Sequence, residues 1–158
     1  MSIDKVRAYL DKYGVADRIR EFDVSSATVE LAAIALGIDG ARIAKSISLS
    51  YGEGALIVVA AGDVKIDNRK FKDRFSIKPK MLSHEDALAF TGHAVGGVCP
   101  FALPEGVLVY LDESLRRFDT VYPAAGSSNS ALPLSCDELF EFSGALGWVD
   151  VCKSREAQ

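Results

Sequence analysis

The chain has 158 residues, 49% of them apolar and 25% charged, which is typical of one globular domain with a single hydrophobic core. Its formal net charge of −4 argues against a general duplex-binding protein, because such a protein needs a basic face to displace counterions. Three cysteines without a C-x-x-C pair argue against a disulfide framework, and two histidines without an HxH or HExxH pattern predict no metal site. No secretory signal or membrane-length apolar run is visible, so we expect a cytoplasmic protein without membrane contact.

Five helices are predicted from apolar residues at helical spacing and from residues that cap helix ends. They cover residues 2–13, 28–36, 68–75, 83–90 and 135–143. The second is capped by Ser26 or Thr28, and Ser135 with Glu138 forms a capping box at the start of the last.

Strands are predicted where apolar residues alternate or form short buried-type runs. They cover residues 20–24, 42–50, 55–61, 107–111, 119–122, 131–134 and 148–151. The second and third flank Tyr51-Gly52-Glu53-Gly54 and read as a hairpin. Since strands occur in hairpins as well as between helices, we expect residues 1–158 to form a single α+β domain with a mixed sheet. No G-x-G-x-x-G follows the first strand and no P-loop motif is present, which argues against nucleotide-binding classes.

A glycine-rich loop follows the fourth predicted helix, and residues 91–101 read T-G-H-A-V-G-G-V-C-P-F. Glycine allows close approach of the backbone, so Gly96 and Gly97 can present bare N–H groups to a ligand. Pro100 fixes its own φ and favours extended geometry at Cys99. A tight connection between helix and strand is the structural alternative.

Lys45 is an isolated cation in the predicted strand 42–50, among Ile43, Ala44, Ile47 and Leu49. Its ammonium group either extends to the surface of a half-exposed strand or is held in a partly desolvated pocket. In the second case it is poised for an anionic or carbonyl group.

The remaining candidates have structural explanations beside functional ones. Thr28 is a helix cap with a secondary role toward substrate, and Ser127, Ser128 and Asn129 after Gly126 form a polar turn that can also line a pocket. His93 is interpreted as a structural hydrogen-bonding residue. Cys99 is interpreted as a buried thiol, and a nucleophile is the alternative. The basic stretch 65–80 is interpreted as a solvated face, and a phosphate-contacting surface is the alternative.

Together these segments resemble the YbaK/prolyl-tRNA-synthetase-associated editing domain family of deacylases. The resemblance rests on T-V-E-L-A-A at 28–33, A-K-S-I at 44–47, A-A-G-D at 60–63, G-H-A-V-G-G-V-C-P-F at 92–101 and Y-P-A-A-G-S-S-N at 122–129. It implies a YbaK-like fold, with a strongly curved, barrel-like mixed sheet flanked by helices. In that family a lysine on a core strand and a G-x-x-x-P loop form the working site, and Lys45 and Gly96 to Pro100 match these positions.

The resemblance also implies a reaction, which is hydrolysis of the ester between an amino acid and the terminal ribose of a mischarged tRNA. Gly96, Gly97 and Val98 are expected to hold the 3′-terminal nucleotide and polarise the ester carbonyl with backbone N–H groups. Lys45 is expected to anchor the substrate, and water attacks with or without help from the neighbouring ribose hydroxyl. Such a site needs no cofactor. The expected partner is the 3′ acceptor end of aminoacyl-tRNA, and an aminoacyl-tRNA synthetase is a second candidate.

The substrate stays open between several amino acids. Some alanine-editing members of the family carry a histidine near the final glycine turn, where this chain has Ser127, Ser128 and Asn129. A more polar pocket favours a seryl or threonyl ester, and cysteinyl-tRNA for proline is a further option. Two other functions remain as alternatives: a non-catalytic module that binds an aminoacyl end or a synthetase in the same pocket, and a thiol enzyme that uses Cys99.

Overall fold

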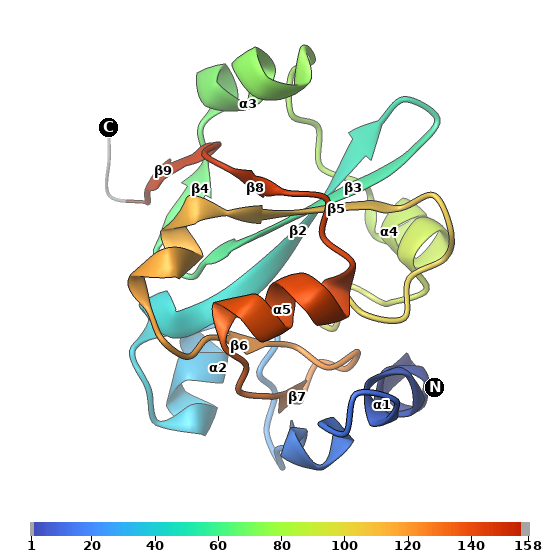
Figure 1. Cartoon of the computed structure of the whole chain (residues 1–158), viewed down its shortest axis with the longest axis vertical. Coiled ribbons are helices and arrows are strands. Elements are labelled where there is room, and N and C mark those ends of the chain that lie inside the picture. The colour runs from blue at the N-terminus through green and yellow to red at the C-terminus, as the bar shows by residue number, and fades with distance from the viewer. Residues whose placement is uncertain (1, 156–158) are drawn as a thin grey trace.

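The computed structural model describes residues 2–155, and a mixed five-stranded sheet flanked by helices forms its centre (Figure 1). The helices are α1 (Ser2–Asp11), α2 (Val29–Leu36), α3 (Asn68–Phe75), α4 (His84–Thr91) and α5 (Cys136–Ser143), with short 3₁₀ turns at Ala16–Arg18, Gly40–Arg42 and Glu113–Arg117. The strands are β1 (Arg20–Glu21), β2 (Ile43–Tyr51), β3 (Gly54–Ala61), β4 (Val64–Ile66), β5 (Leu108–Asp112), β6 (Tyr122–Pro123), β7 (Ser130–Ala131), β8 (Trp148–Val149) and β9 (Cys152–Ser154). This confirms the predicted α+β class.

The central sheet has the order β6-β2-β3-β5-β8. β2 and β3 form the predicted antiparallel hairpin, whereas β6, β5 and β8 each pair in parallel with their neighbour. β3 lies between β2 and β5, and residues 55–61 are all buried, as expected for a strand covered on both faces. Two small antiparallel pairs, β1–β7 and β4–β9, flank this sheet.

Local capping explains where the helices begin. The Thr28 hydroxyl accepts a hydrogen bond from the Leu31 amide, so of the two predicted caps of α2 it is Thr28 that acts. Ser135 and Glu138 form the predicted capping box of α5. The partners in these contacts are only a few residues apart in the chain, which is why the pattern of residues predicts them well.

The predicted strands beyond β5 need correction. Residues 119–120 are not strand, because the Asp112 carboxylate accepts a hydrogen bond from the Ser114 amide and starts a 3₁₀ turn, and pairing resumes with an isolated bridge between Val121 and Leu134 just before β6. Of the predicted strand 131–134 only Ala131 belongs to a strand, β7, and the one at 148–151 is reduced to β8, while β9 begins after it and was not predicted. β4, which pairs with β9, was not predicted.

The ends of the molecule carry different elements. α3 lies at one end, and α1 lies at the other beside the small sheet of β1 and β7 (Figure 1). α2 packs against β2, and α4 packs against β3. Of the helices within residues 2–155, none combines the length and the apolar character needed to cross a membrane.

Candidate functional site

A cavity of about 450 Å³ lies beside β2, within the size range of small-ligand pockets. Six segments that are distant in sequence contribute its lining: residues 26–32, 43–48, 81–84, 95–98, 122–124 and 130–131. Four of the predicted site residues are among them, namely Thr28, Lys45, Gly96 and Val98. The fold therefore brings the predicted lysine and the glycine loop to the same cavity.

The cavity lies where the edge of β2 is open. β6 pairs only with Ile43 and Ala44, and further along the Leu82 amide donates to the Ser48 carbonyl at 3.1 Å. Ser46 lies between these two pairings, and because backbone groups of alternate residues share an edge, its N–H and C=O face the gap. Ser46 also lines the cavity, and its hydroxyl is buried and has no hydrogen-bond partner among the described residues.

Lys45 lies at the cavity edge with its amine held in place. The Nζ atom donates a hydrogen bond to the Val64 carbonyl at the start of β4. Burial lowers the pKa of the Lys45 amine, and the positive charge of Arg155 lowers it further. The side chain is thus partly desolvated, as the pocket interpretation expects.

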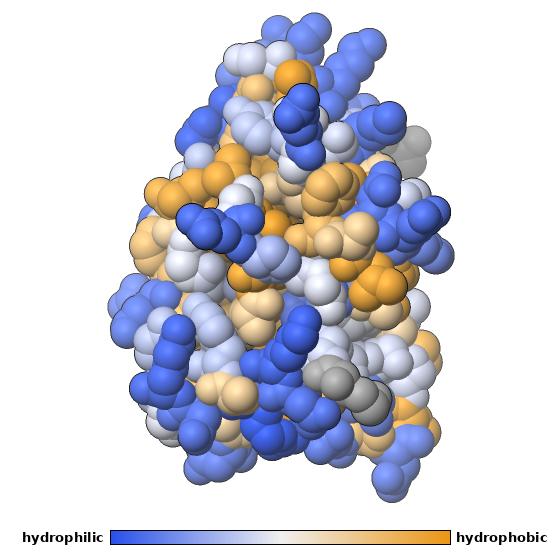
Figure 2. All heavy atoms as spheres, turned by 90° about the vertical axis from the view of Figure 1, so that its right-hand side faces the viewer, coloured by the Kyte–Doolittle hydropathy of each residue, from blue (hydrophilic) through white to orange (hydrophobic). Residues whose placement is uncertain are grey.

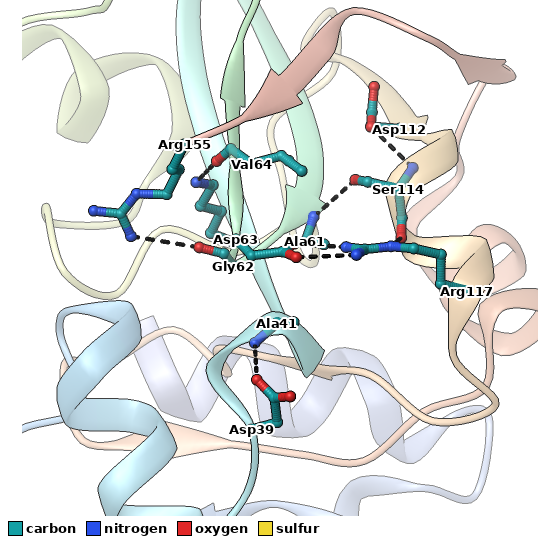
Figure 3. A network of polar contacts seen from close by, with 11 residues as sticks. Asp39, Ala41, Ala61, Gly62, Asp63, Val64, Asp112, Ser114, Arg117 and Arg155 are labelled. Atoms are coloured by element: carbon teal, nitrogen blue, oxygen red, sulfur yellow. Dashed lines mark hydrogen bonds and ion pairs between the residues drawn. The ribbon is translucent and has the colours of Figure 1, made fainter. Parts of the chain in front are cut away.

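The turn before β4, which leads to the Val64 carbonyl that accepts from Lys45, is held by two arginines (Figure 3). Arg117 donates to both carboxylate oxygens of Asp63, at 2.9 and 2.5 Å, and Arg155 donates to the Gly62 carbonyl at 3.4 Å. The Arg117 guanidinium holds the pKa of the Asp63 carboxyl below its usual range. This network fixes the carbonyl that orients the Lys45 amine.

The two glycines of the loop differ in position. Gly96 has φ +92°, a conformation that favours glycine, and it lines the cavity. Gly97 is buried behind the lining, and its N–H donates to the Ala94 carbonyl at 2.9 Å. A Cβ at Gly97 would lie 2.8–2.9 Å from the backbone of Ser127, so close packing requires glycine there.

The turn at 126–129 supports this loop from behind the cavity. Gly126, Ser127, Ser128 and Asn129 all lie outside the lining, as does the buried Pro100. The side-chain amide of Asn129 donates to the Phe22 carbonyl at 2.9 Å. The Ser128 carbonyl accepts from the backbone amide of Ser26 at 2.6 Å. The expected hydroxyl and amide lining from 127–129 is therefore replaced by a scaffold that connects the 22–28 segment to the glycine loop.

His93 and Cys99 are buried away from the cavity lining. His93 hydrogen-bonds through Nδ1 to the Ser2 hydroxyl and through Nε2 to the Phe101 carbonyl at 2.8 Å, which joins α1 to the end of the loop. Burial lowers the pKa of His93 and raises the pKa of the Cys99 thiol to about 12. A buried thiol of that pKa is not a thiolate at neutral pH, which argues against the thiol-enzyme interpretation.

Several lining residues were not predicted. Ser46 and Ser48 follow Ala44 at alternate positions of β2, and this run of small residues is the signal that would have identified them. Met81 and Val95 line the cavity although 61% and 49% of their surface is exposed. Figure 2 shows apolar residues gathered around a hollow on the face that carries α4.

Comparison with known proteins connects this site to a family. The model of the aminoacyl-tRNA editing domain matches residues 24–142, which include every lining segment. The uncharacterized protein YwhH of Bacillus subtilis (strain 168) is 49% identical over 157 residues, covering 99% of this chain and 100% of that protein.

Two solved structures share the fold over nearly the whole chain. One, described as a candidate trans-editing enzyme for prolyl-tRNA synthetase, is 26% identical with a TM-score of 0.87, and the match covers 97% of this chain and 98% of that one. The other, the hypothetical protein APE2540, is 29% identical with a TM-score of 0.84, and the match covers 94% and 99%. This chain belongs to the aminoacyl-tRNA editing domain family.

Proposed function

We propose that this chain is a stand-alone deacylase that hydrolyses the ester bond of mischarged aminoacyl-tRNA. The observation that carries the proposal is the cavity lined by Lys45, by the Gly96 loop and by the open edge of β2. Membership of the editing domain family supports a deacylase-type function. The solved structure described for prolyl-tRNA synthetase makes mischarged proline tRNA the first substrate to test.

In the proposed reaction, water attacks the ester carbonyl carbon, and the carbonyl oxygen becomes an oxyanion. Backbone N–H groups of Gly96 and Val98 stabilise that charge, while the N–H of Gly97 stays in its turn. The Lys45 amine keeps two donors beyond the one given to Val64, and these anchor the substrate. The carbonyl re-forms as the C–O bond to the ribose breaks, and the departing ribose oxygen takes up the proton that the attacking water releases. An ester is labile enough for positioning to supply a useful rate.

We further propose that the amino-acid side chain of the substrate lies near Ser46. A substrate hydroxyl would satisfy the unpartnered Ser46 hydroxyl, and Ser48 adds polarity to the same lining. This keeps the preference for seryl or threonyl esters that the sequence suggested, but assigns it to β2 in place of the 127–129 turn. Buried polar groups discriminate strongly between substrates with and without a matching hydroxyl.

The test is a deacylation assay with proline tRNA charged with alanine, serine, threonine or cysteine. We expect hydrolysis of at least one ester, with the hydroxylated substrates fastest, and a Cys99→Ala variant as active as the wild type. Hydrolysis of alanyl-tRNA alone would reject the proposed preference. Binding of charged tRNA without turnover on any ester would favour the non-catalytic module instead.

A further inference from the structure

A second, basic cleft of about 360 Å³ lies between α3 and the segment that follows it. It is lined by Asn68, Arg69, Lys72, Lys78 and Pro79. The three cations are exposed, and within residues 2–155 none of them forms an ion pair. Lys70 on the same helix forms an ion pair with Asp150 at 3.0 Å, so its charge is compensated, unlike the charges of the three cations in the cleft.

The sequence of α3 directs its charge outward. Phe71 and Phe75 are buried one turn apart, so the remaining positions of the helix face solvent. The nearby Asp67 carboxylate accepts hydrogen bonds from two amides at the helix start, at 3.0 and 3.1 Å, and is occupied there. Beyond the helix, Ser76 adopts a left-handed conformation with φ 66° and turns the chain back, which brings Lys78 to the cleft.

The cleft and the candidate catalytic cavity are connected by one short segment. Lys78 lines the cleft, and Met81 and Leu82 line the cavity. The segment is fixed along β2, since the Lys80 carbonyl accepts from the Ser50 amide at 2.8 Å. Four residues span at most about 14 Å, so Lys78 and Leu82 are no further apart than this. One strand of duplex DNA rises about 3.4 Å per nucleotide, so a nucleic-acid strand covers a span of this order with a few nucleotides.

We propose that this cleft binds phosphate groups of the tRNA acceptor stem, a few nucleotides from the aminoacyl end. The inference rests on the proposed function, because that function places the 3′ end in the neighbouring cavity. Unpaired cations release counterions when they meet phosphates, and this favours binding without reading the base sequence. The formal net charge of −4 repels RNA from the molecule as a whole, so a local basic cleft would also set its orientation.

The first test measures binding of an uncharged RNA hairpin with a single-stranded 3′ end, which requires no catalysis. We expect Arg69→Ala/Lys72→Ala to weaken binding about tenfold at low salt and to flatten the slope of log K against log salt by about 1.4 to 1.8. The charge-preserving Arg69→Lys/Lys72→Arg should bind like the wild type. A matched control, Lys12→Ala/Arg20→Ala, removes two exposed charges near α1, at the opposite end of the molecule. Equal binding by both alanine pairs, or no binding by the wild type, would overturn the proposal.

A second measurement separates this cleft from the catalytic cavity. The Arg69→Ala/Lys72→Ala variant should raise KM for aminoacyl-tRNA about tenfold and leave hydrolysis of the same amino acid on adenosine unchanged. An equal loss on both substrates would show that the change acts on the cavity or the fold, and would reject a phosphate site. If the wild type binds the hairpin through the cleft but hydrolyses neither ester, the proposed function fails while the RNA site stands.

Discussion

Lys45 and Ser46 are adjacent residues of β2 whose surroundings are unfavourable for stability. Burial disfavours the charged form of the Lys45 amine, and the Ser46 hydroxyl is buried without a partner. An unsatisfied buried hydroxyl costs about 1–3 kcal/mol. Perturbed and unsatisfied groups of this kind are concentrated at functional sites, and here both lie at one cavity.

Ser46→Ala should separate stability from activity. Because the change removes an unsatisfied hydroxyl, we expect the free energy of unfolding to stay equal or to rise by about 1 kcal/mol. Hydrolysis of the seryl ester should slow about tenfold, while the alanyl ester is little affected. Denaturant unfolding and paired kinetic assays measure the two effects. Ser130→Ala is the control, since its hydroxyl is already bonded to that of Ser127 at 2.7 Å, and a uniform loss on all substrates would contradict the assignment.

Cys99→Ala should leave kcat/KM within about twofold of the wild type. The thiol is fully buried with a pKa of about 12, so its contribution is packing, and its removal should cost about 1–2 kcal/mol of stability. Steady-state kinetics below the unfolding transition give the comparison. Loss of turnover in a folded Cys99→Ala protein would restore the thiol mechanism.

Among the elements, the glycine loop, the 126–129 turn and the segment before α2 behave as one packed unit. Gly96 approaches Ala27, with 3.1 Å between the Ala27 Cβ and a Cβ built at Gly96, and Gly97 packs on Ser127. The Ser128 carbonyl accepts the amide of Ser26 at 2.6 Å. The position of the backbone donors at the cavity therefore depends on contacts made outside it.

Gly97→Ala should damage both folding and catalysis. The new methyl group would lie within 2.9 Å of three backbone atoms of Ser127, which cannot move as a side chain would. We expect a loss of about 1–3 kcal/mol in unfolding free energy and a fall in kcat, because the loop must shift. Gly147→Ala is the matched control, since its nearest contact is a Tyr110 ring atom at 3.9 Å. Full activity and stability in Gly97→Ala would show that the loop tolerates displacement.

Elements with local determinants were predicted from the sequence, whereas short elements without a local pattern were missed. The hairpin of β2 and β3 and the caps at Thr28 and Ser135 depend on residues a few positions apart. β4 has three residues, and its partner β9 lies almost ninety positions away, so no local pattern marks it. The 3₁₀ turn after β5 depends on one Asp112 side-chain contact and was likewise missed.

At the scale of the whole molecule, the site is an assembly of six segments around an open strand edge. The resemblance of the sequence to a family predicted Lys45 and Gly96 as site residues from contiguous motifs, and both residues line the cavity. It also placed the 127–129 turn in the lining, whereas that turn packs behind Gly97, and only the three-dimensional arrangement shows this. Ser46 was missed because its significance comes from a gap on one edge of β2, between the pairing with β6 and the hydrogen bond from Leu82, whereas on the other edge it pairs with Val59.

The stability of the whole chain should fall in mild acid because of His93. Burial lowers the pKa of His93 in the folded state below the ordinary value of 6.5, which the unfolded state keeps. At a pH between the lowered and the ordinary pKa, the unfolded state therefore binds more protons than the folded state. Stability should therefore decrease as the pH falls below about 6.5, and a His93→Gln variant should lack this part of the slope. The carboxyl of Asp63, whose pKa is lowered by Arg117, loses its contribution only below about pH 4. Urea unfolding from pH 5 to 8 measures the difference, and parallel slopes for both proteins would contradict it.

The central claim is tested most directly by single-turnover hydrolysis of mischarged proline tRNA by the wild type and by Lys45→Ala. We predict that the wild type releases the amino acid and that Lys45→Ala is slower by at least about a hundredfold, corresponding to about 2.7 kcal/mol of transition-state stabilisation. Thermal unfolding of both proteins shows that the variant is folded. Equal rates in the two folded proteins would contradict the account.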